Sequence, residues 1–366
     1  MGIKNLNTLI ESNSQNGINK RHLSSFSGKV LAIDTNVYLY KYLYGKSNHI
    51  DGMFFMINKF KKFGITPIFI LDGKPPDEKI DTIKNRRLIK DRLEEKLSLL
   101  KIQVESSKDD TEIQEIQKEI DMIEKKIIYV NKNVIEKTKI LFDLMGVVYI
   151  EADCEAEHYC SKLCNLDIVD GVVSEDMDTI ACGSKLVIRN FTNRDDNVES
   201  YYFQDILYDL ELNHKSFIDL CILLGNDYNH RPRGLCPNDV YEIIKEYKSI
   251  ENIISNNVLS NWNCNYDRIR SIIKLENIFI DKKELTRQFN KKPNITSLKS
   301  FLKSSSTIDE KTYLHRINLI YFQHRKNDWN IKKNLFRKET EYKLSKMNKK
   351  YSNYNNNNVS VSSMNF

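Results

Sequence analysis

Residues 68–72 read IFILD, four apolar side chains that end at a carboxylate. Residues 30–34 repeat this arrangement as VLAID. A third apolar run, over residues 168–173, is interrupted by an Asp-Gly pair and leads into the acidic stretch 174–176. Short apolar runs that are bounded by turn residues are typical of strands buried on both faces, as in a parallel sheet. The sequence therefore predicts three buried strands, each followed by an acid.

Two further runs, at residues 147–150 and 186–188, have the same apolar character, and helical patterns separate the five predicted strands. Strands that alternate with helices are typical of an α/β fold. We therefore expect a mainly parallel central sheet flanked by helices. In such sheets ligands bind beyond the carboxyl ends of the strands, which is where the acids fall.

The composition of the 366 residues, with 40% hydrophobic and 29% charged, is that of a globular chain of one large domain or two. No apolar window is long enough for a transmembrane helix, and the first residues lack a signal-peptide pattern, so we expect a soluble, intracellular protein that is not secreted. Residues 325–350 carry ten Lys/Arg and three Asp/Glu. This basic segment indicates an anionic partner, or equally a solvated tail.

Residues 79–140 differ from the rest because they are charged, helical in pattern and free of Gly and Pro. Residues 106–110, SSKDD, are the expected break between two helices. The segment fits a hairpin packed on the sheet or a projecting arm. Its opening residues, 79–92, carry six basic and two acidic side chains, which favours contact with phosphates.

The later part of the chain contains a second recognisable pattern. Residues 216–224 predict a helix that ends at Gly225, and a further helix is expected over residues 237–247, where proline occupies the favourable first turn. Beyond residue 250 we expect more helix. The Asn-rich end is polar and of low complexity, which predicts disorder.

Seven acids lie at the ends of the predicted elements. So many neighbouring carboxylates repel one another, raise one another's pKa values and require cations. Oxygen ligands without His or Cys select Mg²⁺ or Mn²⁺, and two such ions suit in-line displacement at a phosphodiester. The alternative is that each acid is a helix cap or a surface residue. The candidate ligands are Asp34, Asp72, Glu155, Glu157, Asp176, Asp178 and Asp227.

Taken together, the sequence motifs resemble those of the flap endonuclease (XPG-type) family of structure-specific, metal-dependent 5′ nucleases. The motifs occur in the family's order over roughly residues 1–250. They are MGIKNL at residues 1–6, AID at 32–34, FILDGKPP at 69–76, EAE at 155–157, SEDMD at 174–178 and LLGNDY at 223–228.

This resemblance implies a role for each acid. Asp34, Asp72, Glu155 and Glu157 would surround one metal, and Asp176, Asp178 and Asp227 would hold the second. The expected cofactors are thus two Mg²⁺ ions per chain, with Mn²⁺ as a substitute. Lys79 and Arg86 match the family's two catalytic basic residues over the scissile phosphate.

The resemblance also implies DNA contacts. Tyr40 matches an aromatic on which the terminal nucleobase stacks, and Gly2 matches a glycine near the site. Segment 216–248 resembles the helix–two-turn–helix that grips duplex DNA with the help of a potassium ion. The expected DNA-binding residues are Gly2, Tyr40, Lys46, Gly225 and Gly234.

The expected domains follow from the same resemblance. Residues 1–100 form the N-terminal nuclease region and 141–250 the internal one with the helix–two-turn–helix. Residues 79–140 form a helical arch through which a 5′ single strand threads. A C-terminal helical region covers 251–340, and 341–366 form a basic, Asn-rich disordered tail.

Two features depart from the family's pattern. Cys236 replaces the second glycine of the G-x-G-P hairpin in residues 234–237, GLCP, which argues against the potassium ion. The tail lacks the glutamine–aliphatic–double-aromatic box, so a sliding-clamp partner is not supported.

The resemblance thus implies a monomeric, nuclear enzyme that hydrolyses phosphodiester bonds in branched DNA with a 5′ flap, during replication, repair or recombination. Preference for a flap, a nick or gap, or a four-way junction stays open. One alternative is a catalytically inactive scaffold that binds branched DNA. Another is a haloacid-dehalogenase-type phosphatase, since Asp176 and Asp178 form a D-x-D motif, but its later G-D-x-x-x-D motif is absent.

Overall fold

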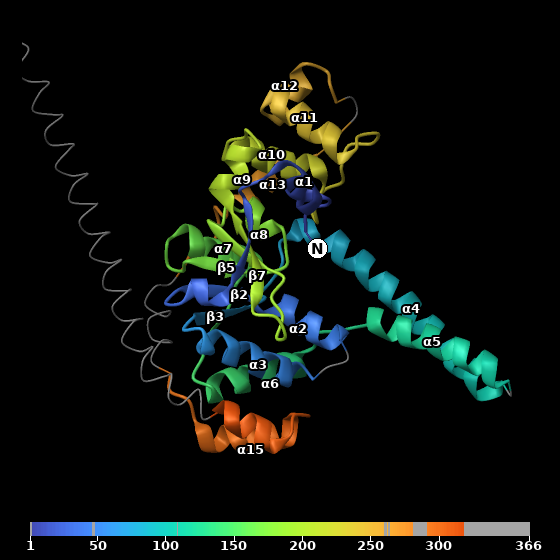
Figure 1. The fold of residues 1–366 in the computed structure, drawn as a ribbon. Helices are drawn as coiled ribbons and strands as arrows, with labels where there is room; N and C mark the ends of the chain where they lie inside the picture. Colours follow the sequence, from blue (N-terminus) through green and yellow to red (C-terminus); the bar gives the residue numbers. More distant parts are fainter. Residues whose placement is uncertain are drawn as a thin grey trace, which may run out of the picture.

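A mixed, mainly parallel sheet lies at the centre of the computed structural model (Figure 1). The structure describes residues 2–45, 48–107, 109–259, 262, 264–280 and 291–317. In these residues the sheet has seven strands in the order β1-β7-β6-β5-β2-β3-β4. The strands are β1 (Ile18–His22), β2 (Val30–Asp34), β3 (Thr66–Leu71), β4 (Val148–Glu151), β5 (Gly171–Val173), β6 (Leu186–Arg189) and β7 (Asn197–Tyr202).

The five predicted strands are confirmed as β2 to β6, and each pairs in parallel with its neighbours among them. The sequence did not predict β1 and β7. These two pair with each other in antiparallel fashion, and β7 also pairs with β6. The α/β fold class is therefore confirmed, with a two-stranded antiparallel extension at one edge.

Helices cover both faces of the sheet because its central strands are apolar on both faces. Leu31, Ile33 and Phe69 pack on one face with α3, α6 and α15, while Ala32 and Ile68 pack on the other with α7. The helices here are α2 (Thr35–Tyr44), α3 (His49–Lys62), α6 (Lys132–Leu144), α7 (Ala156–Asn165) and α15 (Ile295–Ser305). Two short 3-10 helices occur as well: η1 (Leu23–Phe26) connects β1 to β2, and η2 (Asp77–Lys79) follows β3.

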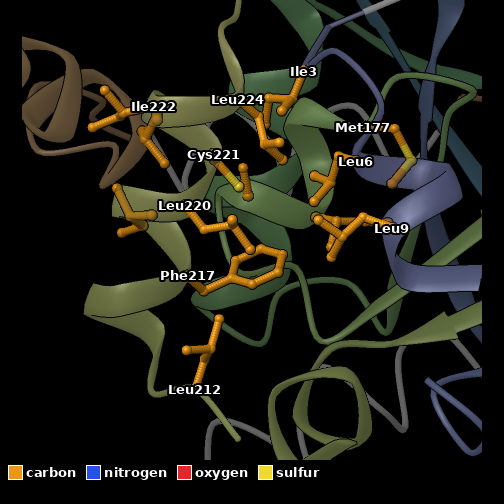
Figure 2. Close-up of a cluster of buried hydrophobic side chains, with 14 of the residues drawn as sticks. Ile3, Leu6, Leu9, Met177, Leu212, Phe217, Leu220, Cys221, Ile222 and Leu224 are labelled. Atoms are coloured by element: carbon orange, nitrogen blue, oxygen red, sulfur yellow. The ribbon is translucent and has the colours of Figure 1, made fainter. Parts of the chain in front are cut away.

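A third apolar cluster joins the start of the chain to the helices that follow the sheet. Figure 2 shows Leu6 and Leu9 of α1 near Met177, with Phe217 and Cys221 of α10 in the same cluster. Met177 lies between two of the candidate acids in the sequence, so its packing in this cluster helps to fix the position of both acids. The helices are α1 (Leu6–Asn13), α8 (Asp178–Ala181), α9 (Phe203–Asp209), α10 (His214–Leu224), α11 (Pro237–Tyr247), α12 (Ile250–Ser255) and α13 (Tyr266–Ile273).

Helices α4 (Ile80–Ser106) and α5 (Asp110–Lys126) form a hairpin that projects away from the sheet (Figure 1). Of the two arrangements open from the sequence, the projecting arm is the one observed. The predicted break is confirmed between Ser106 and Asp110. The arm has its own small apolar core, built from one side chain per turn of each helix, which includes Leu93, Leu97, Leu100, Ile116, Ile120 and Ile123.

The predicted helix pair near residues 216–247 is confirmed. Helix α10 ends at Gly225, whose φ of 84° is costly for any residue with a Cβ. Helix α11 begins at Pro237 and is capped by Cys236.

No helix in the described part of the chain is long and apolar enough to cross a membrane. The predicted disordered tail at 341–366 and the basic segment 325–350 lie outside the described residues.

Candidate metal centre

The structure brings the predicted acids together at the carboxyl edge of the sheet. Each one stands where an element ends or begins, so the fold of the elements fixes its position. Asp34 ends β2 and caps α2, and Asp72 follows β3 directly. The others are Glu155 and Glu157 at the start of α7, Asp176 between β5 and α8, Asp178 as the first residue of α8, and Asp227 just after α10.

Most of these acids are withdrawn from water. Five have exposed fractions between 2% and 7%, whereas Asp72 lies at the exposed rim and Asp227 is partly buried. Buried carboxylates are costly unless they are paired or bind a cation. The cluster therefore requires positive charge in its centre. The five are Asp34, Glu155, Glu157, Asp176 and Asp178.

Three of the buried acids can bind one metal ion together. Carboxylate oxygens of Glu157, Asp176 and Asp178 all lie within 4.8 Å of one another. The Oδ1 atom of Asp178 is buried and has no hydrogen-bond partner among the described residues. An all-oxygen donor set with an unpartnered carboxylate fits a hard divalent cation such as Mg²⁺ or Mn²⁺. This trio takes Glu157 from the first metal group that the resemblance implies, and Asp176 and Asp178 from the second.

The pKa values of the clustered acids also indicate a cation site. Burial, followed by repulsion from Asp72, raises the pKa of Asp34 to about 8. Burial also raises the pKa of Asp178 well above its usual range, and the neighbouring Asp176 carboxylate raises it further. For Glu157 the causes are burial and Glu155. At neutral pH the cluster therefore holds protons unless cations replace them.

Lys79 supplies one positive charge inside the cluster. Its side chain is buried, and its ammonium forms ion pairs with Glu155, with Glu157 at 3.8 Å and with Asp227 at 3.0 Å. Burial alone would lower the pKa of Lys79, but the surrounding carboxylates, Glu157 and Glu155 foremost, raise it above its usual range. Lys79 therefore stays charged and partly neutralises the acids.

Arg86 lies two turns further along the arm and reaches the same cluster. Its Nη2 atom donates to Asp227 Oδ1 at 2.7 Å, although half of the arginine side chain is exposed. Thr82, between the two basic residues, donates its hydroxyl to the Asp227 backbone carbonyl at 2.8 Å. The base of the arm is thus fixed to the loop after α10, with both cations facing the acids.

Several residues that the sequence analysis missed complete the site. Ser174 donates to Asp34 Oδ2 at 2.8 Å, and Asn36 donates to Asp72. The hydroxyl of Tyr228 donates to Glu155 Oε2 at 3.0 Å, with the ring of His158 beside it. Two signals were available: Tyr228 belongs to the LLGNDY stretch, and His158 lies one helical turn after Glu155.

The predicted DNA-binding residues fall into different places. Gly2 lies against the acids, because a Cβ there would be 2.0 Å from Asp176 Oδ1. Tyr40 lies on α2 with 38% of its surface exposed. Gly225 accepts from Lys4 N at 3.0 Å, and Gly234 has a φ of 85° in open space. The fifth candidate contact, Lys46, lies outside the described residues.

Comparison with known proteins identifies the family. The XPG N-terminal domain matches residues 1–93, and the XPG I-region matches residues 146–227. Flap endonuclease 1 of Encephalitozoon cuniculi is 35% identical over 275 residues, which is 70% of this chain and 76% of the relative. The chain belongs to the XPG-type flap endonuclease family.

Solved structures of this family share the fold. Flap endonuclease-1 from Methanococcus jannaschii is 25% identical with a TM-score of 0.60, over 84% of this chain and 96% of that one. The catalytic core of Rad2 in complex with DNA substrate is 24% identical with a TM-score of 0.59, over 87% and 99%. The second likeness shows the fold alone.

Proposed function

We propose that this member of the XPG family is a divalent-metal-dependent endonuclease that hydrolyses phosphodiester bonds in branched DNA beside a 5′ flap. One observation carries the proposal: the seven acids, three of which form a buried trio that requires a cation, gather where Lys79 and Arg86 at the base of the projecting arm pair with them. The relatives named flap endonuclease 1 support the same substrate class. A monomeric state and a nuclear location belong to this proposal.

The acids would hold two Mg²⁺ ions. In the proposed division Asp34, Asp72, Glu155 and Glu157 surround one ion, and the remaining three acids, Asp176, Asp178 and Asp227, hold the other. Glu157 lies between the two groups, because its carboxylate approaches Asp176 and Asp178. When bound, such a pair of ions activates water and stabilises the attacking and leaving oxygens of the phosphodiester.

Lys79 and Arg86 would neutralise and orient the scissile phosphate. Both side chains pair with Asp227 in the structure. Their positive charges beside the acids would attract a phosphate to this site. Both start from the base of one helix, which places them on the same side of the substrate.

The remaining regions would bind the rest of the DNA. Helices α10 and α11, joined through Gly225 and Gly234, would grip the duplex. The arm of α4 and α5 would guide the 5′ single strand. Cys236, which caps α11 where the family has glycine, argues against a potassium ion in this hairpin.

The test is the substitution Asp176→Asn, which removes one charge at nearly constant volume. We expect it to lower single-turnover cleavage of a 5′-flap substrate in Mg²⁺ by at least about a thousandfold while DNA binding persists. Asp205→Asn, an exposed acid at the start of α9, is the matched control and should leave cleavage unchanged.

A panel of flap, nicked, gapped and four-way substrates would define the preferred structure. Wild-type protein that binds these substrates without cutting them would indicate the inactive scaffold. Hydrolysis of a small phosphate ester in place of DNA would indicate the phosphatase. Cleavage by Asp176→Asn within tenfold of wild type would contradict the metal assignment.

A further inference from the structure

An exposed aromatic pair lies where the arm joins the core. Tyr40 is on α2, and Tyr129 is in the segment between α5 and α6, with exposed fractions of 38% and 43%. Both rings face one ammonium group, because Lys90 Nζ of α4 lies 5.8 Å from the centroid of Tyr40 and 4.3 Å from that of Tyr129. Three elements distant in sequence therefore converge on one point.

The chain holds the two rings in this arrangement. Lys90 Nζ donates to the backbone carbonyl of Ile128 at 2.5 Å, which fastens the segment carrying Tyr129 to α4. The backbone of Val130 lies next to the Tyr40 hydroxyl, which fastens the same segment to α2. Both ring faces consequently border the space that the ammonium fills.

Helix α4 links this point to the metal centre, because Arg86 and Lys90 lie four residues apart on the same face of that helix. Tyr40 lies within electrostatic range of the Asp72 carboxylate and of the Arg86 guanidinium. Arg86 in turn lies near Lys90 and pairs with Asp227. A strand that leaves the acids past Arg86 therefore reaches the two rings next.

We propose that Tyr40 and Tyr129 form a clamp for one unpaired nucleobase of the 5′ strand, which enters between the rings and displaces the Lys90 ammonium toward a neighbouring phosphate. This inference rests on the proposed function, because it specifies how that site holds the flap. The resemblance implies only Tyr40 as a stacking surface, and Tyr129 is the addition.

The chemistry of the pocket fits a single strand. Aromatic rings beside basic side chains bind single-stranded DNA without sequence preference, because every base has a stacking face. Aromatic rings pair with their centroids ~4.5–7 Å apart, and Lys90 Nζ lies at comparable distances from both tyrosine rings. A base in its place would contact both. A cation over an exposed ring is held more weakly than a stacked base, so the exchange favours the DNA.

The experiment compares Tyr129→Ala and Tyr129→Phe in the full chain. The probe is a flapped duplex with 2-aminopurine in the unpaired strand, whose fluorescence is quenched on stacking. We expect strong quenching by wild type and Tyr129→Phe and weaker quenching with Tyr129→Ala, in which only the Tyr40 ring remains. We also expect Tyr129→Ala to raise the half-saturating enzyme concentration about tenfold for the flapped duplex, and less for the same duplex without a flap.

Two further variants separate a clamp from a structural contact within the arm. Tyr208→Ala removes a tyrosine on α9 that is 82% exposed, and it should leave quenching and affinity as in wild type. Lys90→Ala removes the contact between α4 and Tyr129 but keeps both rings, so quenching should persist. Quenching weakened equally in Lys90→Ala and Tyr129→Ala would overturn the clamp, because the rings would then only support the arm.

Unchanged quenching and half-saturation in Tyr129→Ala would also overturn the clamp, while the proposed function would stand if wild type cuts the flap. The fluorescence titration depends on binding alone. It therefore decides the clamp even if wild type cuts no substrate, an outcome that would count against the proposed function instead.

Discussion

Lys79 and Arg86 show how two residues with one expected role differ in their surroundings. Lys79 is 8% exposed and pairs with three acids, whereas Arg86 is half exposed and pairs with one. Alanine in place of the half-exposed Arg86 is expected to fold normally. The burial of Lys79 leads to a different expectation, because its removal leaves buried carboxylates without a partner.

We therefore expect Lys79→Ala to lower the free energy of unfolding by about 3 kcal/mol in the absence of divalent metal, and Mg²⁺ to restore most of it. Arg86→Ala should change this free energy by less than about 0.5 kcal/mol. Both variants should slow single-turnover cleavage roughly a hundredfold at saturating enzyme and Mg²⁺. Urea unfolding in EDTA and in Mg²⁺ provides the measurement. Equal stability of Lys79→Ala and wild type in EDTA would mean that the acids do not depend on this ammonium.

At the scale of the element, Cys236 between α10 and α11 replaces a glycine of the family pattern and takes a capping role instead. Cys236 has a φ of −82°, which any residue can adopt, and its Sγ accepts from Asp239 N at 3.5 Å. The Asp239 carboxylate in turn accepts from Cys236 N at 2.7 Å. The cysteine thus caps α11, as Ser or Thr does elsewhere.

This cap makes Cys236→Gly a clean test of the hairpin. Glycine at this position costs only a few tenths of a kcal/mol, because it is itself tolerated as a cap. If the cysteine weakens an ion site, the variant should bind duplex DNA more tightly in potassium than in sodium buffer. Cys236→Ser keeps a capping side chain and serves as the control. Identical affinities of Cys236→Gly and wild type in both buffers would show that this hairpin uses no potassium.

At the scale of the whole molecule, folding collects acids that the unfolded chain keeps apart. Burial, followed by their mutual repulsion, raises the pKa of Asp34 from 3.8 to about 8 and raises the pKa values of Glu157 and Asp178 as well. A raised pKa in the folded state means that folding binds protons. The free energy of unfolding therefore has its full value below the pKa that these acids have in the unfolded chain. It falls as the pH rises through their pKa in the folded state.

Without metal, the free energy of unfolding should consequently fall as the pH rises from about 4 to about 8. Saturating Mg²⁺ should flatten or reverse this trend, because the ion binds the ionised acids of the folded state. Urea unfolding across this range, in EDTA and in Mg²⁺, checks both statements. Asp34→Asn should reduce the slope in EDTA. Stability that rises with pH in EDTA would contradict the buried, proton-holding cluster.

Much of the architecture follows from local sequence patterns. Strands β2 and β3 contain continuous apolar runs, α10 is followed by a glycine, and the arm lacks Gly and Pro throughout. The acids were predictable for the same reason, since each follows a strong element. Where neighbouring residues by themselves determine whether a segment forms a helix or a strand, the sequence alone is sufficient to predict that element.

Contacts between distant residues were decided only by the tertiary structure. Strand β1 is polar, and it is a strand because β7, far along the chain, pairs with it. The sequence left the direction of the arm open. Likewise, the buried pair of Arg270 with Asp219 joins helices that no local pattern connects. The placement of Lys79 among three acids could not be predicted either, because its partners come from two other segments of the chain. A side chain's neighbours across the fold depend on how all elements pack, and no short stretch of sequence contains that information.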